Sequence, residues 1–346
     1  MTLLRRNLLK LTAAAALSLG ASTTMSVAQD VTLRLHQFLP PQANVPKNII
    51  IPWIEKIQEA SNGRIKIDHF PAMQLGGKPP ELIDQAIDGV ADIVWTVSGY
   101  SAGRFPHTEV FELPFMMSDA EATSSAYWEM AQKYMVDGEF KDFHLLGAWV
   151  HGPGIIHSSD PIMTPEDLNG VKLRAPTRVT NLLFSGMGAT AVGMPVPAVP
   201  EALSKGVIDA TVIPWEVTGA LKVPELVTNH LEFGDETLYT TTFLFAMNKA
   251  KYNALPDDLK AILDENSGAA FSAFAGKQMQ IDDAPGRELA LDLGNEVTTL
   301  SPEQVDVWRA AAAPTVDKWV EDMKAKGIDG VALIDEAKAL IEKYSN

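Results

Sequence analysis

The sequence predicts an α/β protein of two lobes, and three features of its pattern support this. Strands alternate with helices in two successive blocks, which is typical of open mixed sheets flanked by helices. A further strand and several long helices follow the second block, and no linker rich in Gly or Ser separates the blocks. The chain is therefore expected to cross between the lobes more than once, and its 346 residues are enough for two domains.

The first block contains three predicted strands and two predicted helices. Apolar and polar residues alternate at 31–39 and 64–70, and an apolar run at 90–97 is suited to a buried parallel strand. Amphipathic helices are expected between them at 47–63 and 76–89, the second with Pro in its first turn and Gly at its end. The block is thus a βαβαβ unit.

The second block opens with a short helix at 164–170. Thr164 is its expected N-cap, Pro165 is its first residue, and Asp167 completes a capping box before Gly170 ends the helix. These local signals indicate a helix that leads directly into a strand.

One arginine stands at the end of that strand. The predicted strand Val171–Leu173 leads directly to Arg174, and Ala175-Pro176 then ends the strand. Because crevices form at strand ends in open α/β sheets, Arg174 is a candidate for binding an anion, and an ion pair within the protein is the alternative. The block continues with helices and strands expected at 179–188, 189–194, 199–206 and 207–214.

The C-terminal third begins with a strand at 241–248. Residues 255–294 are expected to be helical over most of their length, with a break near Pro285-Gly286, and two more helices are expected at 301–327 and 334–344. We expect the lobes to comprise the following ranges: 29–149 with 240–280, and 150–239 with 281–346.

Residues 1–28 have the pattern of an export signal. A basic start precedes an apolar run that is too short to span a membrane, and a small-x-small exit follows. Arg5-Arg6 fits a twin-arginine signal as well as an ordinary secretory signal, and both routes end outside the cytoplasm. After Ala28 there is no second apolar run of about 18 residues, so the mature chain is not expected to span a membrane. The expected location is the periplasm.

Charge and cysteine content exclude several functions. The formal net charge is −16, and removal of the signal would remove three basic residues and no acid. Such an acidic body repels nucleic acid and anionic membranes, so an anionic small molecule would need a buried cation to hold it. The absence of Cys excludes disulfides, thiol catalysis and cysteine-metal sites. We expect no metal, no other cofactor and a monomer.

Five phrases in order resemble the solute-binding subunits of tripartite ATP-independent periplasmic (TRAP) transporters, the DctP-type family. They are "GVADIVWT", "VFELPFM", "TPEDLNGVKLRAPT", "GMPVPAVPEALSKGVIDATV" and "FAMNKAKYNALPDDLKAIL". The resemblance covers essentially the whole mature chain. It implies the two-lobed periplasmic binding protein fold, a ligand buried between the lobes, a long helix crossing both, and membrane permease subunits as partners.

The resemblance also implies a role for Arg174. In the family the arginine of the "KLRAP"-type phrase pairs with a substrate carboxylate, which suits a guanidinium because its flat donor fork matches a carboxylate. Two positions depart from the sialic-acid branch of the family. Gly154 stands in place of a second arginine, and Ile213 in place of an asparagine before Pro214. One charged anchor in a more apolar cleft therefore favours a small monocarboxylate, either aromatic or a branched 2-oxo acid.

Several aromatic residues are candidates for the walls of the cleft. Trp215 is the main one, because it lies at a predicted strand end, and Phe38 ends the first strand. For Trp95 and Trp149 a place in the core is as plausible as ligand contact.

Three polar candidates have more than one plausible role. Glu216 is expected to orient a ligand group, cap a helix or bind a cation, as in some relatives. For His151 and His157 a hydrogen bond to a ligand hydroxyl and a satisfied structural role are equally open.

An enzyme is the first rival interpretation. No GxSxG, HExxH, Walker or GxGxxG motif is present, and the spacing of His151, Glu216 and Asp209 does not demand an acid-base set. We therefore expect no catalytic residues. The sequence is also compatible with a solute-binding subunit of an ATP-driven importer and with a ligand-binding domain that feeds a sensor.

Overall fold

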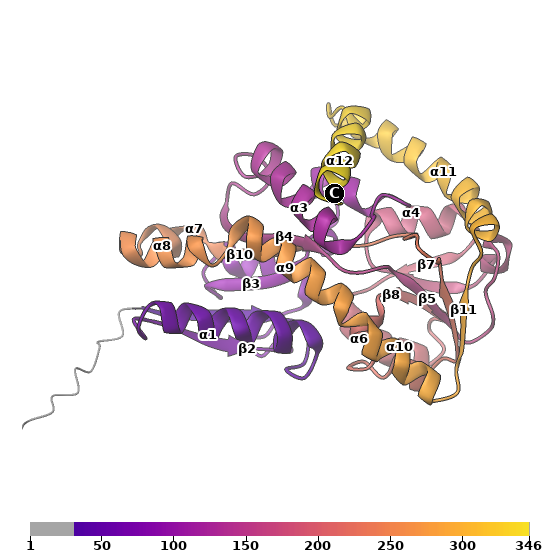
Figure 1. The fold of residues 1–346 in the computed structure, drawn as a ribbon, viewed down its shortest axis with the longest axis horizontal. Coiled ribbons are helices and arrows are strands. Elements are labelled where there is room, and N and C mark those ends of the chain that lie inside the picture. The colour runs from indigo at the N-terminus through magenta and orange to yellow at the C-terminus, as the bar shows by residue number, and fades with distance from the viewer. Residues whose placement is uncertain (1–30, 346) are drawn as a thin grey trace, which may run out of the picture.

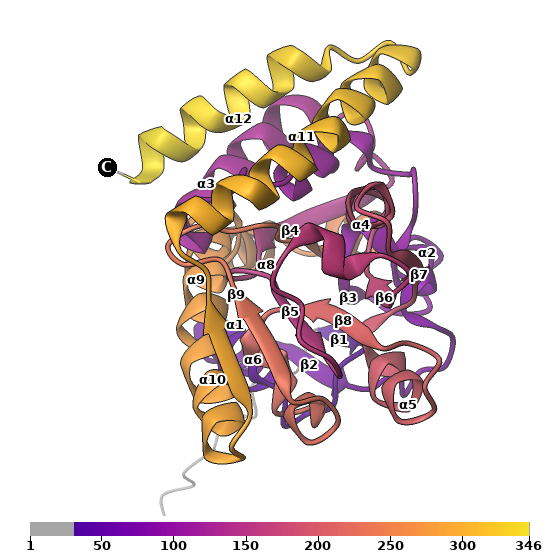
Figure 2. The ribbon, with the colours of Figure 1, turned by 90° about the vertical axis from the view of Figure 1, so that its right-hand side faces the viewer.

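Two mixed β-sheets form the centres of two lobes, and helices cover both sheets (Figures 1 and 2). The structure is a computed structural model that describes residues 31–345. The expected export signal, residues 1–28, lies outside the described residues. The predicted α/β class and two-lobed architecture are confirmed.

The first sheet has the strand order β2-β1-β3-β10-β4. β1 pairs in parallel with β2 and β3, whereas β10 runs antiparallel between β3 and β4. The bounds are β1 Val31–Gln37, β2 Ile65–Phe70, β3 Ile93–Val97, β4 Phe143–Val150 and β10 Thr242–Asn248. The strands expected in the first block are present, but β4 was not predicted.

The second sheet has the order β11-β9-β5-β8-β6-β7. β6 is parallel to β7 and β8, and β5 is antiparallel to β8 and β9. The bounds are β5 Ile155–Ser158, β6 Lys172–Ala175, β7 Thr190–Gly193, β8 Ala210–Ile213, β9 Asn229–Glu232 and β11 Glu296–Thr299. The sequence interpretation missed β5, β9 and β11, which have four residues each and no clear alternation.

Helices flank each sheet (Figures 1 and 2). Their bounds are α1 Ile51–Ala60, α2 Leu82–Ile87, α3 Ala120–Met130, α4 Arg178–Gly186, α5 Val199–Ser204, α6 Trp215–Thr218, α7 Lys249–Asn253, α8 Asp257–Glu265, α9 Gly268–Ile281, α10 Asp283–Asp292, α11 Pro302–Ala325 and α12 Gly330–Ser345. No helix within residues 31–345 is long and apolar enough to cross a membrane.

The chain passes between the two sheets at 151–154, after β4, and returns at 233–241, before β10. α9 packs on the first sheet and α10 on α6 beside the second, so the two helices form one diagonal across both lobes (Figure 1). The break falls at Asp282, three residues before the position expected from Pro285-Gly286. Pro285 instead lies in the first turn of α10, where it interrupts no helical hydrogen bond.

The C-terminal helix returns to the first sheet's side of the molecule. α12 packs against α3, which covers the first sheet, as Figures 1 and 2 both show. The division of the chain into 29–149 with 240–280 and 150–239 with 281–346 remains our proposal for the lobes. In this division α12 belongs to the second lobe, so its contact with α3 joins the two lobes near the C-terminus.

Candidate functional site

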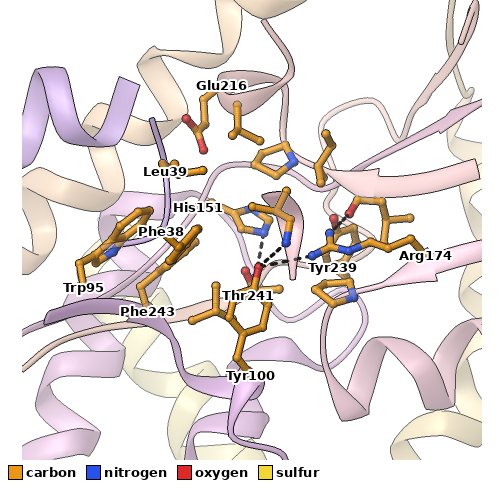
Figure 3. A pocket seen from close by; sticks show the side chains of 17 residues that line it. Phe38, Leu39, Trp95, Tyr100, His151, Arg174, Glu216, Tyr239, Thr241 and Phe243 are labelled. Atoms are coloured by element: carbon orange, nitrogen blue, oxygen red, sulfur yellow. Dashed lines mark hydrogen bonds between the residues drawn. The ribbon is translucent and has the colours of Figure 1, made fainter. Parts of the chain in front are cut away.

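A cavity of about 390 Å³, including the part that opens to solvent, lies between the two sheets where strands of both end (Figure 3). The lining residues are mostly apolar or aromatic: Phe38, Leu39, Trp95, Val97, Tyr100, His151, Arg174, Pro176, Val196, Val212, Ile213, Pro214, Glu216, Val217, Tyr239, Thr241 and Phe243.

Arg174 is the next-to-last residue of β6 and brings the only Lys or Arg side chain among these lining residues. It is 2% exposed, and its Nε and Nη1 donate to the carbonyl oxygens of Met194 and Val212 at 2.9 Å each. No carboxylate within residues 31–345 forms an ion pair with it, so the internal ion pair that the sequence left open is not seen in the described part of the chain. Because a buried charge is costly unless it is paired, this guanidinium is suited to an anionic ligand.

Two tyrosines flank the guanidinium. Tyr100, which follows β3, accepts a hydrogen bond from the Val196 N–H at 2.9 Å and lies 3.5 Å from Arg174 Nη2. Tyr239 is buried, and its hydroxyl has no hydrogen-bond partner within the described chain. Burial raises the pKa of both hydroxyls above the usual value, so both remain protonated donors.

Aromatic rings form the opposite wall. Phe38 stacks on Trp95 with ring centroids 4.7 Å apart, and Trp95 stacks on Phe243 at 5.2 Å. The Trp95 Nε1 is buried and has no partner in residues 31–345. Trp149 stacks behind Trp95 at 6.4 Å and does not line the cavity, so Trp149 is a core residue. Flat walls of this kind suit a planar apolar body.

Glu216 lies in α6 at the side of the cavity away from Arg174 (Figure 3). The side chain is buried, and its Oε2 has no hydrogen-bond partner among the described residues. Burial, with smaller contributions from Asp283 and Asp282, raises the pKa of Glu216 well above its usual value. The cavity therefore has a cationic end and an uncharged or weakly acidic end.

His151 lines the cavity, and both of its ring nitrogens are bonded within the protein. Its Nδ1 donates to the Gly152 carbonyl, and its Nε2 accepts the Thr241 N–H at 3.1 Å. Burial lowers the pKa of His151 to about 4, so the ring is neutral near pH 7. Because both nitrogens are used within the protein, His151 has no free group for a ligand hydroxyl in this structure.

His157 does not line the cavity. Its Nδ1 lies 2.8 Å from His230 Nδ1, and its Nε2 lies 3.2 Å from the Ile213 carbonyl oxygen. A structural role for this histidine agrees with these contacts.

The placement predicted for Trp215 is wrong. Its Nε1 donates to Glu232 Oε1 at 2.9 Å, and its ring lies 4.9 Å from the rings of His157 and His230, behind the second sheet. The reason is that α6 begins at Trp215, and the start of a helix turns this side chain away from the cavity. Ile213, two residues earlier, does line the cavity.

Gly154 also lies behind the lining residues rather than among them. A Cβ at this position would collide with the ring of Tyr239, so the glycine makes room for that ring. Sequence reasoning missed Tyr100, Tyr239, Thr241 and Phe243. The sequence did contain a signal for residues 239–243, because they lie at the start of the strand predicted at 241–248. Arg174 was found by the same kind of signal, since it lies at the end of a predicted strand.

No group of three or more His, Cys, Asp or Glu side chains in the described part of the chain is arranged to hold a metal ion. The cation role considered for Glu216 therefore has no support from neighbouring ligands. The site thus offers a ligand one guanidinium and one tyrosine hydroxyl, opposite a wall of flat apolar rings.

Comparison with known proteins places the chain in a family. Residues 37–322 match the model of the bacterial extracellular solute-binding proteins, family 7. A TRAP solute-binding protein from Rhodoferax ferrireducens T118, solved with copurified benzoate, is 50% identical, with a TM-score of 0.90 and coverage of 91% of this chain and 98% of that one.

Two further relatives support the same family assignment. A marine metagenome TRAP solute-binding protein specific for aromatic acid ligands, solved with 3-hydroxybenzoate, is 47% identical over 92% of this chain and 100% of that one, with a TM-score of 0.90. The C4-dicarboxylate-binding periplasmic protein DctP of Rhodobacter capsulatus is 25% identical over 95% of this chain and 98% of its own length. The chain therefore belongs to extracellular solute-binding protein family 7, the DctP-type solute-binding proteins of TRAP transporters.

Proposed function

We propose that this protein captures an aromatic monocarboxylate between its lobes and delivers it to the membrane permease of a TRAP transporter. The observation that carries the proposal is Arg174, a buried guanidinium without a carboxylate partner among the described residues, which faces a slot walled by Phe38, Trp95 and Phe243. The ligand carboxylate would accept hydrogen bonds from the free N–H groups of Arg174 and from the Tyr239 hydroxyl. The ring would lie against the aromatic wall.

The same geometry argues against other acids. A dicarboxylate would need a second cation, and the lining residues offer Glu216 instead. A sugar acid would leave several hydroxyls buried without partners, at about 1–3 kcal/mol each. The benzoate and 3-hydroxybenzoate found in two similar proteins support the aromatic class. Branched 2-oxo acids are the second series, because Ile213 and Val212 provide an apolar but less planar surface.

Thermal-shift screening followed by calorimetric titration tests the proposal. The panel holds benzoate, hydroxybenzoates, phenylacetate, branched 2-oxo acids, C4-dicarboxylates and sialic acid. Aromatic monocarboxylates should give the largest shifts, stoichiometric binding and no product. A larger shift with a dicarboxylate or sialic acid would overturn the proposed class, and steady-state turnover would favour an enzyme.

Export and delivery belong to the same proposal. We expect the mature protein, after loss of residues 1–28, to act as a monomer in the periplasm, whether it leaves by the Sec or the twin-arginine route. Uptake of the ligand by cells that carry the membrane subunits should require this protein. Ligand uptake that is unchanged when its gene is deleted would contradict the delivery step.

A further inference from the structure

Three buried polar atoms of the cavity have no hydrogen-bond partner within residues 31–345: Trp95 Nε1, the Tyr239 hydroxyl and Glu216 Oε2. Polar atoms in a protein interior are almost always partnered, so unpartnered ones at a cavity wall point to groups that a ligand completes. The proposed carboxylate accounts for Tyr239, which lies beside Arg174. It does not account for Glu216, which lies on the other side of the cavity (Figure 3).

The backbone of Glu216 is fixed from two sides. Its N–H donates to Asp283 Oδ1 at 2.8 Å, at the start of α10, and its carbonyl accepts from Asn44 Nδ2 at 2.7 Å, in the loop after β1. The side chain, in contrast, makes no hydrogen bond or ion pair in the described structure to any basic residue. The fold thus holds Glu216 Oε2 at an apolar cavity without a hydrogen-bond partner among the described residues, which is unfavourable unless another molecule supplies one.

We propose that Glu216 is a specificity-determining residue, which binds a hydroxyl group on the aromatic ring of the ligand at the end away from the carboxylate. This inference rests on the proposed function. A phenolic hydroxyl donates one hydrogen bond and accepts another, so it suits Glu216 in either protonation state. Trp95 Nε1 is a second unpartnered donor in the same cavity and is available to the oxygen of that hydroxyl.

Ligands that differ in this one group should bind with different affinities. 4-Hydroxybenzoate places a donor opposite its carboxylate, and 3-hydroxybenzoate places one at the neighbouring ring position. Benzoate has a C–H at both positions, and a methoxybenzoate has an oxygen that only accepts. A site with a buried polar group discriminates strongly against a ligand that lacks the matching group, because the protein group is then left unpaired. The wild-type protein should therefore bind the better of 3- and 4-hydroxybenzoate about 10- to 100-fold more tightly than benzoate or the matching methoxybenzoate.

Calorimetric titration of wild type, Glu216→Gln and Glu216→Leu with these ligands is the experiment. Glu216→Leu should lose most of the preference for the hydroxyl while its affinity for benzoate stays equal or rises, and Glu216→Gln should fall between. Glu201→Gln removes an exposed carboxylate on α5, away from the cavity, and should leave the preference unchanged. This control separates direct contact from the loss of one negative charge.

The outcomes distinguish the two proposals. If no aromatic carboxylate binds, the proposed function fails. If benzoate and hydroxybenzoates bind the wild-type protein equally, or if Glu216→Leu weakens both to the same degree, the function stands and the role of Glu216 is overturned. A preference that appears only after addition of Na⁺ or Ca²⁺ would also overturn the direct contact. The wild-type ligand series remains decisive even if a variant fails to fold.

Discussion

The ring of Tyr239 lies over Gly154, at the place where a side chain at position 154 would begin. The Gly154 N–H also donates to the Tyr239 carbonyl at 3.0 Å, so two of the segments that cross between the lobes are joined here. The sequence resemblance identifies Gly154 as the site of a missing second arginine. The structure adds that an aromatic ring occupies that space, and that its side chain lies beside Arg174 (Figure 3).

Enlarging Gly154 should therefore impair the site. In Gly154→Ala the new methyl group must displace the Tyr239 ring, at a cost of about 1–3 kcal/mol in stability. Affinity for the carboxylate ligand should fall with it, as measured by calorimetric titration. Gly186→Ala is the matched control, because a Cβ at Gly186 meets open space. Equal affinities in wild type and Gly154→Ala would show that the position of Tyr239 is unimportant.

Arg174→Ala should weaken binding of an aromatic carboxylate by about 2–5 kcal/mol, because the ligand charge would be buried without its partner. The unliganded protein should stay folded, since the described structure pairs Arg174 with no carboxylate. Arg174→Lys should restore little, because a point charge does not replace the donor fork. Lys172→Ala removes an exposed charge from the same strand and is the control. Near-wild-type affinity in Arg174→Ala would remove this residue from the site.

Tyr239→Phe should reduce carboxylate affinity by about 1.5–3 kcal/mol, the usual contribution of a hydrogen bond to a charged group. Tyr127→Phe is a comparable change elsewhere: Tyr127 is equally buried, bonds Ser98 Oγ at 3.3 Å and does not line the cavity. Titration of both variants separates a ligand contact from a loss of stability. Equal affinity losses in the two variants would argue against a direct contact.

Ligand should favour the closed arrangement of the lobes. Tyr100 bonds the Val196 N–H, and Asn44 bonds the Glu216 carbonyl, so groups from both lobes meet around the cavity. A ligand that bridges them stabilises closure. Small-angle scattering should give a smaller radius of gyration with saturating ligand than without it. Identical scattering curves would contradict a two-lobed clamp.

Glu112 should make stability depend on pH. Burial raises the pKa of Glu112 from 4.5 to about 7, although its Oε1 accepts from the Thr242 N–H and hydroxyl. The folded state keeps a proton that the unfolded state releases, so this stability is full below pH 4.5 and is lost as the pH rises to 7. At about 1.4 kcal/mol per pKa unit, the loss is on the order of 3 kcal/mol.

Denaturant unfolding of Glu112→Gln between pH 4.5 and 8 measures this contribution. The amide keeps the acceptor for Thr242 and cannot ionise, so the variant should gain stability relative to wild type as the pH rises. The contributions of other titrating groups to the pH dependence are the same in both proteins, so they cancel when the two stabilities are compared. Parallel profiles for the two proteins would show that Glu112 is not responsible.

Local signals in the sequence were enough for much of the fold. The strands at 31–37, 65–70 and 93–97 follow from alternation and apolar runs, and the box formed by Thr164 and Asp167 is present as expected. These features depend on neighbours in the chain, which is why pattern alone finds them. The end of β6 was located in the same way, and with it Arg174.

Sequence pattern alone predicts the α/β class and the side chains available at strand ends, namely Arg174, Phe38, Glu216 and Ile213. Which aromatic side chains face the cavity depends on the tertiary fold. β10 inserts between β3 and β4 and brings Phe243 to Trp95, and the chain leading into it brings Tyr239 over Gly154. Trp215 turns away because a helix starts there. The orientation of these side chains depends on contacts between segments far apart in sequence, and a local sequence pattern does not contain that information.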